Sequence, residues 1–312
     1  MKYRRLGKTG LEVSLLGIGT GGSSQFGQKS NVAEDEVLKL VHRALELGIN
    51  FFDSSAVYGD SEAILGRALS EVPRQDYILA TKFAPVKEGG AVAPESVVES
   101  IERSLQRLQV ETIDIIQFHG VSPADYEPVI ERLLPTVQKL QAQGKFRFLG
   151  ISETYGHDAG HETVPKALRQ GVFDTAMIGY NFLSPGAEQI LPDCQQQNLG
   201  VIGMVAVRKS LSRPEHLLQR LEDAGRRGVI DRSALPAEDP LGWLVRGAVE
   251  SVPAAGYKYV AAHPAIGTVL SGTANIEHLE ANVRAILGPA LPDEDMARLR
   301  QVFGQVREPL GD

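Results

Sequence analysis

The chain is short of cysteine, of long apolar runs and of positive charge. Cys194 is the one cysteine among 312 residues, so neither an internal disulfide nor a multi-cysteine metal site is possible. No apolar run approaches the ~20 residues that span a membrane, and residues 1–7 lack the apolar core of a signal peptide. A net charge of −7 argues against a nucleic-acid binder, whose affinity needs a basic face. We therefore expect a cytoplasmic protein that contacts neither membrane nor nucleic acid and holds no metal.

His157 and His161 flank a short polar segment, a pattern that also occurs in metal sites. No third ligand is evident in the sequence around them. We expect both histidines to lie on a solvated loop.

Apolar runs alternate along the chain with stretches of helical periodicity. The runs that predict strands occupy residues 13–19, 49–53, 77–83, 113–119, 146–152, 174–181, 201–207 and 266–271. Repeated strand–helix units predict a parallel sheet, and eight units predict a sheet closed into a (β/α)8 TIM barrel of the α/β class. No linker or low-complexity segment interrupts residues 1–312, so we assign the chain to one domain.

Segments outside this repeat predict further elements. Residues 3–14 predict a β-hairpin. The seventh connection, residues 208–264, predicts helices near 213–224, 240–251 and 253–262, and one more helix is expected over 292–306 at the C-terminus. The alternative, an open doubly wound sheet, is disfavoured because residues 17–22 lack the glycine spacing of a dinucleotide-binding turn and no helix follows them directly.

Four side chains able to carry protons lie at or just beyond the ends of different predicted strands. Asp53 ends the second strand and Tyr58 follows shortly after it, while Lys82 and His119 lie at the ends of the third and fourth. The C-terminal ends of barrel strands converge on one face, where the chemistry takes place. We therefore expect these four residues to form a proton-transfer site.

The physical chemistry of these groups indicates a redox enzyme. A lysine ammonium about 4 Å from a phenol stabilises the phenolate by roughly 4 kcal/mol at an effective dielectric near 20. Asp53 would hold Lys82 in place, and His119 would hydrogen bond a substrate oxygen. A carbonyl protonated by Tyr58 accepts hydride at carbon, and because no side chain donates hydride the site requires a nicotinamide or a flavin.

Several motifs together resemble the aldo-keto reductases over nearly the whole chain. They are Gly48-Ile-Asn-Phe-Phe-Asp53-Ser-Ser-Ala-Val-Tyr58-Gly59 with Ser61-Glu62, Thr81-Lys82, Gln117-Phe-His119, Gly150-Ile-Ser152, Tyr180-Asn181, and Ser271-Gly272-Thr273 leading to Asn282. The resemblance implies a barrel plugged at its base by the N-terminal hairpin, NAD(P)H across the C-terminal face, and interconversion of a carbonyl and an alcohol. It also implies that Tyr58 is the general acid/base, that Asp53 and Lys82 tune it, and that His119 orients the substrate carbonyl.

The resemblance further implies a set of cofactor-binding residues. Ser152 would contact the nicotinamide carboxamide, and the loop that begins at Arg208 would cover the cofactor. The adenosine end would lie near the start of the last barrel helix, where backbone N–H groups favour a phosphate. The full set is Gly19, Thr20, Ser152, Val207, Arg208, Ser271, Gly272, Thr273, Asn275 and Asn282.

The sequence departs from the family pattern around the cofactor. Glu153 stands where an Asn that contacts the carboxamide is usual, Met177 replaces a common Gln, and Val207 occupies the region of a stacking aromatic. Gly272 and His278 occupy places where NADPH-preferring members have a Lys and an Arg. We therefore favour NAD over NADP, although Arg208, Lys209 or Arg213 could restore a phosphate site.

Two functional hypotheses are compatible with this sequence. The pattern is similar to the NAD-linked sugar 1-dehydrogenases of the family, such as L-galactose or D-threo-aldose dehydrogenases, which indicates an enzyme that interconverts a small aldehyde, ketone or sugar lactone with an alcohol or lactol. The alternative is a cofactor-binding regulatory subunit with slow turnover, resembling the β-subunits of potassium channels. Substrate identity and oligomeric state are left open by the sequence.

Overall fold

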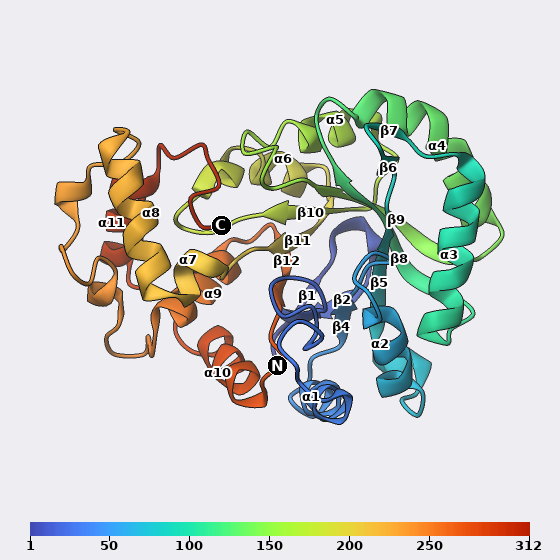
Figure 1. Ribbon diagram of the computed structural model, residues 1–312, viewed down its shortest axis with the longest axis horizontal. Coiled ribbons are helices and arrows are strands. Elements are labelled where there is room, and N and C mark those ends of the chain that lie inside the picture. Colours follow the sequence, from blue (N-terminus) through green and yellow to red (C-terminus); the bar gives the residue numbers. More distant parts are fainter.

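Eight parallel strands form a closed barrel in the computed structural model, which describes residues 1–312 (Figure 1). Each strand pairs with the next, and β12 pairs with β3 to close the ring through Val269 and Leu16. The strands are β3 (Leu16–Gly19), β4 (Phe51–Asp53), β5 (Ile78–Phe83), β8 (Ile113–Val121), β9 (Phe146–Glu153), β10 (Thr175–Gly179), β11 (Gly200–Met204) and β12 (Ile266–Ser271). This confirms the predicted TIM barrel. The first predicted strand, residues 13–19, divides between the hairpin and β3.

Helices surround the barrel and bury one apolar face each against it. In α3 (Pro94–Leu108), Val97, Ile101, Leu105 and Leu108 are buried at helical spacing, and Pro94 lies in the first turn, where its missing N–H has no partner to lose. The other helices of the repeat are α1 (Glu34–Glu46), α2 (Ser61–Leu69), α4 (Tyr126–Ala142), α5 (Thr163–Gln170), α6 (Leu191–Gln196) and α10 (Ile276–Leu287). No helix is long and apolar enough to cross a membrane.

An N-terminal hairpin closes the lower end of the barrel, as expected. Strands β1 (Tyr3–Arg5) and β2 (Glu12–Ser14) pair antiparallel. Leu6, fully buried at the turn, packs where the barrel strands begin, because a Cβ on Gly200 or Gly267 would lie within 2.8 Å of its side chain. Glycine at these two positions therefore allows the plug to fit.

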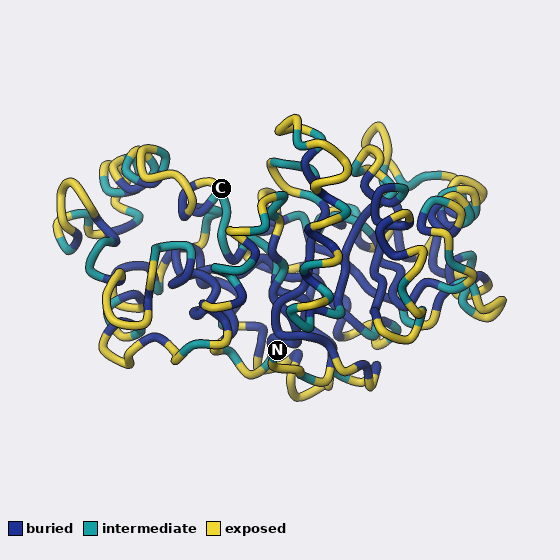
Figure 2. Tube along the Cα trace, turned by 90° about the horizontal axis from the view of Figure 1, so that it is seen from below, coloured by how far each residue is buried: buried dark blue, intermediate teal, exposed yellow.

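The core has two layers. An inner cluster inside the barrel joins the plug to inward-facing strand residues and consists of Leu6, Leu11, Val13, Phe51, Ile78, Ala80, Ile115, Met177 and Ile202. A larger cluster of 76 buried residues lies between the strands and helices and continues under the long connection after β11. Figure 2 shows the buried chain at the centre and exposed residues on the outer helices and loops. The inner cluster supports the strand ends from below.

The long connection between β11 and β12 carries α7 (Lys209–Ser212), α8 (Pro214–Arg226) and α9 (Val252–Ala262). The helix predicted over residues 240–251 is wrong. That segment has only a short 3-10 turn, Gly242–Leu244, because glycine breaks the helical pattern and Gly247 adopts a left-handed backbone conformation with φ +56°. Trp243 instead packs under the Arg298 guanidinium at 4.2 Å. The C-terminal helix is confirmed as α11 (Asp293–Phe303), on the side of the barrel away from α3 and α4 (Figure 1).

Candidate active site

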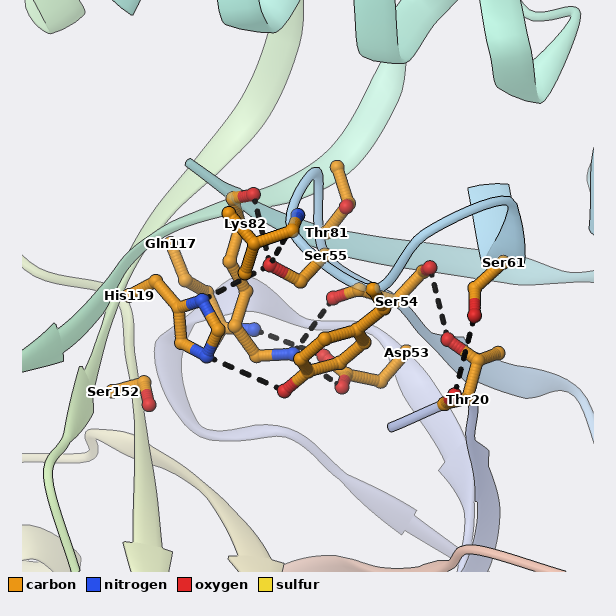
Figure 3. A network of polar contacts seen from close by, with 12 residues as sticks. Thr20, Asp53, Ser54, Ser55, Ser61, Thr81, Lys82, Gln117, His119 and Ser152 are labelled. Atoms are coloured by element: carbon orange, nitrogen blue, oxygen red, sulfur yellow. Dashed lines mark hydrogen bonds and ion pairs between the residues drawn. The ribbon is translucent and has the colours of Figure 1, made fainter. Parts of the chain in front are cut away.

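The four residues expected to converge do meet at the C-terminal face of the barrel. Asp53 is the last residue of β4, Lys82 lies near the end of β5, and His119 lies in the last part of β8. Tyr58 stands in the loop between β4 and α2 and turns back over the same face. Figure 3 shows the side chains from these neighbouring strands joined in one polar network.

An ion pair lies at the base of this network. The Lys82 ammonium donates to Asp53 Oδ2 at 2.5 Å and to the Ser54 carbonyl at 2.7 Å, and Gln117 Nε2 donates to Asp53 Oδ1 at 3.1 Å. Burial disfavours charge on Lys82, but the charges of Asp53 and Tyr58 outweigh this effect and raise its pKa. Burial also raises the pKa of Asp53, against the opposing charge of Lys82. The amine keeps its proton, so the network contains a fixed positive charge.

The Tyr58 ring packs between the Lys82 ammonium and the backbone of the loop that follows β3. The Lys82 Nζ lies 5.2 Å from the centre of the Tyr58 ring. On the other side of the ring, a Cβ at Gly21 would lie 2.6 Å from Tyr58 Cε2, closer than two non-bonded carbon atoms can approach. Only glycine at position 21 therefore lets the ring occupy this place.

His119 contacts the Tyr58 hydroxyl edge-on. His119 Nε2 lies 3.3 Å from Tyr58 Oη, and the two rings are nearly perpendicular, at 82°. Burial, and then the charge of Lys82, lower the pKa of His119 to about 3. The imidazole is therefore neutral at neutral pH and acts through hydrogen bonds alone.

Three residues of this network had no role in the sequence-based assignment. Gln117 holds Asp53, and Ser55 Oγ lies 3.0 Å from His119 Nδ1. Gln28 Nε2 donates to the Tyr58 carbonyl at 3.1 Å, and its Oε1 accepts from Asp60 N at 2.9 Å. Ser55 and Gln117 lie within the motifs that pointed to the site, whereas Gln28 lies in a polar loop with no local signal.

A cleft of about 1300 Å³ runs from Asp53 and Tyr58 to the start of α10. Seven of the ten expected cofactor-binding residues line it: Gly19, Val207, Arg208, Gly272, Thr273, Asn275 and Asn282. A Cβ on Gly22 or Gly272 would have no atom within 3.6 Å, so both glycines leave room on its wall for a ligand to approach the backbone. An extended group with a phosphate end fits this cleft, because the N-terminus of α10 opens into it.

The other three expected cofactor-binding residues do not line the cleft. Ser271 Oγ accepts from Asn282 Nδ2 at 3.0 Å, and Thr20 Oγ1 donates to Ser54 Oγ at 2.9 Å. Ser152 is buried near the end of β9, which pairs with the strand that carries His119 (Figure 3), and its hydroxyl donates to the Glu153 carbonyl at 3.3 Å. Ser271 thus contacts Asn282, which lines the cleft. Thr20 contacts Ser54, whose carbonyl accepts from the Lys82 ammonium.

The Glu153 side chain is buried and contacts other protein groups instead of lining the cleft. Its Oε1 accepts from Gly179 N at 2.7 Å, and its Oε2 lies 2.9 Å from His161 Nδ1. Burial raises the pKa of Glu153, against the hydrogen bond from His161. The expectation that His161 is solvated is wrong, because only 2% of it is exposed. No cluster of three or more side chains suited to a metal occurs in the structure.

Charged groups from α1, from α10 and from the segment around α7 line the cleft. Glu36 and Glu277 line it, as do the cations Arg208, Lys209 and Arg213. Arg208 Nε and Lys209 Nζ lie 2.8 and 3.3 Å from the same Asp312 oxygen. Two of the three cations are therefore already paired.

Comparison of the sequence and the fold with known proteins finds several similar chains. L-galactose dehydrogenase of Arabidopsis thaliana is 33% identical over 304 residues, covering 92% of this chain and 88% of that protein. The uncharacterized oxidoreductase YqkF of Bacillus subtilis is 26% identical and covers 96% of each chain. Among solved structures, aldo-keto reductase AKR11C1 from Bacillus halodurans in its holo form superposes with a TM-score of 0.74 at 25% identity, covering 100% of both chains.

The family model described as the aldo/keto reductase family matches residues 16–303, from the first barrel strand to the end of α11. Proteins of this family are oxidoreductases that use NAD(P)H and act on small carbonyl compounds. With that match across the barrel and a relative of 33% identity along nearly its whole length, this chain belongs to the aldo/keto reductase family.

Proposed function

We propose that this protein is an NAD-linked aldose 1-dehydrogenase that oxidises a sugar lactol at C1 to a lactone, with Tyr58 as the general acid/base. The observation that carries the proposal is the position of the Tyr58 ring, with the Lys82 ammonium 5.2 Å from its centre and His119 Nε2 3.3 Å from its hydroxyl. The sugar assignment is supported by the similarity to L-galactose dehydrogenase. Residues 1–312 act as one domain.

Tyr58 moves the proton in this mechanism. In the oxidation, the phenolate takes the proton of the sugar C1 hydroxyl, and in the reverse reaction the phenol returns it. The positive charge of Lys82 stabilises the phenolate, and Asp53 with the Ser54 carbonyl holds the ammonium in position. Neutral His119 donates a hydrogen bond to the same substrate oxygen and so orients it.

The cleft holds the cofactor. A bound nicotinamide supplies the hydride chemistry that no side chain can provide. Gly272, Thr273, Asn275 and Asn282 would surround the adenosine end. Preference for NAD is supported by Glu36 and Glu277 in the cleft and by the pairing of Arg208 and Lys209 with Asp312, which leaves little positive charge for a 2′-phosphate.

A substrate panel with both cofactors tests the proposal. We expect NADH to form with one or more aldoses, with a lower Michaelis constant for NAD⁺ than for NADP⁺. Tyr58→Phe should abolish hydride transfer and leave the Kd of NAD(H), measured by fluorescence quenching, within about twofold. Retained activity in Tyr58→Phe would reassign the acid/base. Tight cofactor binding with almost no turnover across the panel would instead indicate the regulatory-subunit alternative.

A further inference from the structure

Ser55 contacts the imidazole of His119 from the loop that carries Tyr58. It is fully buried in the loop that follows β4, three positions before Tyr58. Its Oγ is 3.0 Å from His119 Nδ1 (Figure 3), whereas the other ring nitrogen, Nε2, lies 3.3 Å from Tyr58 Oη. The two nitrogens of His119 thus have separate partners, Ser55 and Tyr58.

The Ser55 hydroxyl has one proton and two acceptors within reach, His119 Nδ1 at 3.0 Å and the Lys82 carbonyl at 3.3 Å. The Lys82 carbonyl already accepts the Ala56 N–H at 3.0 Å. His119 Nδ1 has no other partner. The Ser55 oxygen accepts the Val57 N–H at 3.4 Å, and of the two acceptors for the hydroxyl proton His119 Nδ1 makes the shorter contact, which favours donation from Ser55 to Nδ1.

A neutral imidazole carries one proton, so acceptance at Nδ1 leaves the proton on Nε2. We propose that Ser55 is a positioning residue that holds His119 in the tautomer protonated at Nε2. That N–H points toward the place of the substrate oxygen beside Tyr58 Oη. With the proton on Nδ1 instead, a lone pair on Nε2 would face the lone pairs of the substrate oxygen and repel it. The effect on turnover rests on the proposed function, whereas the tautomer itself does not.

Nitrogen-15 NMR of the imidazoles tests the tautomer directly. The protein has seven histidines, and comparison with a His119→Gln sample assigns the signals of His119. In the wild type we expect a protonated Nε2 and an unprotonated Nδ1. In Ser55→Ala we expect His119 to populate both tautomers. Ser55→Thr keeps the hydroxyl and should keep the proton on Nε2. A wild-type signal with the proton on Nδ1, or an unchanged tautomer in Ser55→Ala, would overturn the proposal.

Ser54→Ala is the matched control for the tautomer. It removes a buried hydroxyl one position away, which contacts Thr20 Oγ1 at 2.9 Å and not His119. We expect the His119 signals to be unchanged in this variant. A change as large as that in Ser55→Ala would show that any lost hydroxyl in this loop disturbs the ring, and would overturn the assignment to Ser55.

Kinetics supply the second measurement. Loss of one hydrogen bond of ordinary strength predicts a fall in kcat of about tenfold in Ser55→Ala, with recovery in Ser55→Thr and no change in the Kd of NAD(H). Equal kcat in Ser55→Ala and the wild type would overturn the role in turnover. The NMR result requires neither substrate nor cofactor, so it stands or falls separately from the sugar dehydrogenase assignment.

Discussion

Lys82 Nζ lies 2.5 Å from Asp53 Oδ2 inside the barrel mouth, with both side chains almost completely removed from solvent. Removing one member of such a pair leaves a buried charge without compensation, which typically costs about 3–5 kcal/mol. Asp53→Asn and Lys82→Met should therefore each lower the free energy of unfolding by about this amount, as measured by urea denaturation.

The double variant Asp53→Asn/Lys82→Met removes both charges at once. We expect it to be more stable than the sum of the two single losses predicts, because neither charge remains unpaired. Strictly additive losses would show that the two groups do not interact in the folded protein.

Gln28 links the loop after β3 to the loop that carries Tyr58. It donates to the Tyr58 carbonyl and accepts from Asp60 N, while Gly22 and Ser24 of the same loop line the cleft. Gln28→Ala should lower kcat by about tenfold and stability by about 1–3 kcal/mol, because the Asp60 N–H and the Tyr58 carbonyl lose their side-chain partner. Steady-state kinetics and urea denaturation give the two values.

Gln25→Ala is the control for this prediction. It truncates a glutamine in the same loop that contacts Gln28 through its backbone carbonyl, which the substitution leaves in place. Comparable losses in the two variants would mean that Gln28 has no specific role in positioning Tyr58.

Cofactor preference should respond to charge at the start of α10. Glu277→Lys replaces a carboxylate that lines the cleft with an amine. A charge-assisted hydrogen bond to the 2′-phosphate should lower the Kd of NADP(H) by about tenfold or more, with little change for NAD(H). Fluorescence titrations with both cofactors measure the ratio.

Glu131→Lys makes the same change in net charge on an exposed position of α4, outside the cleft. It should leave both Kd values unchanged. An equal gain in NADP(H) affinity from Glu131→Lys would indicate a long-range effect of net charge, and no gain from Glu277→Lys would remove the local charge argument for NAD.

The lowered pKa of His119 predicts that the stability of the protein depends on pH. Its pKa is lowered from 6.5 to about 3 in the folded protein, so between these values the unfolded chain binds the extra proton. The contribution of neutral His119 to the free energy of unfolding is therefore complete above pH 6.5 and is lost as the pH falls toward about 3. His119→Gln should have a shallower loss of stability on acidification than the wild type, measured by urea denaturation at a series of pH values.

Parallel stability curves for His119→Gln and the wild type below pH 6.5 would contradict the lowered pKa. The same shift predicts that kcat shows no histidine ionisation near neutral pH, since His119 is already neutral there.

The sequence alone was sufficient for the barrel because its signals are local. Apolar runs and helical periodicity predict strands and helices one at a time, and the order of the eight units leaves few ways to close the sheet. The wrong helix over residues 240–251 was also local in origin. Residues 240–251 carry apolar residues at plausible spacing, yet Gly242 and Gly247 end the helix pattern, and Trp243 finds its partner on α11.

By itself the sequence also determined which residues stand at the strand ends, and hence that Asp53, Lys82 and His119 share one face with Tyr58 nearby. Only the tertiary structure decided how they contact one another. The neighbours of Tyr58 include Gly21 and Gln28 from a loop distant in the sequence, and Glu153 lies inside the protein against His161. Hydrogen bonds between distant segments depend on strand register and side-chain packing, which no local pattern of residues encodes.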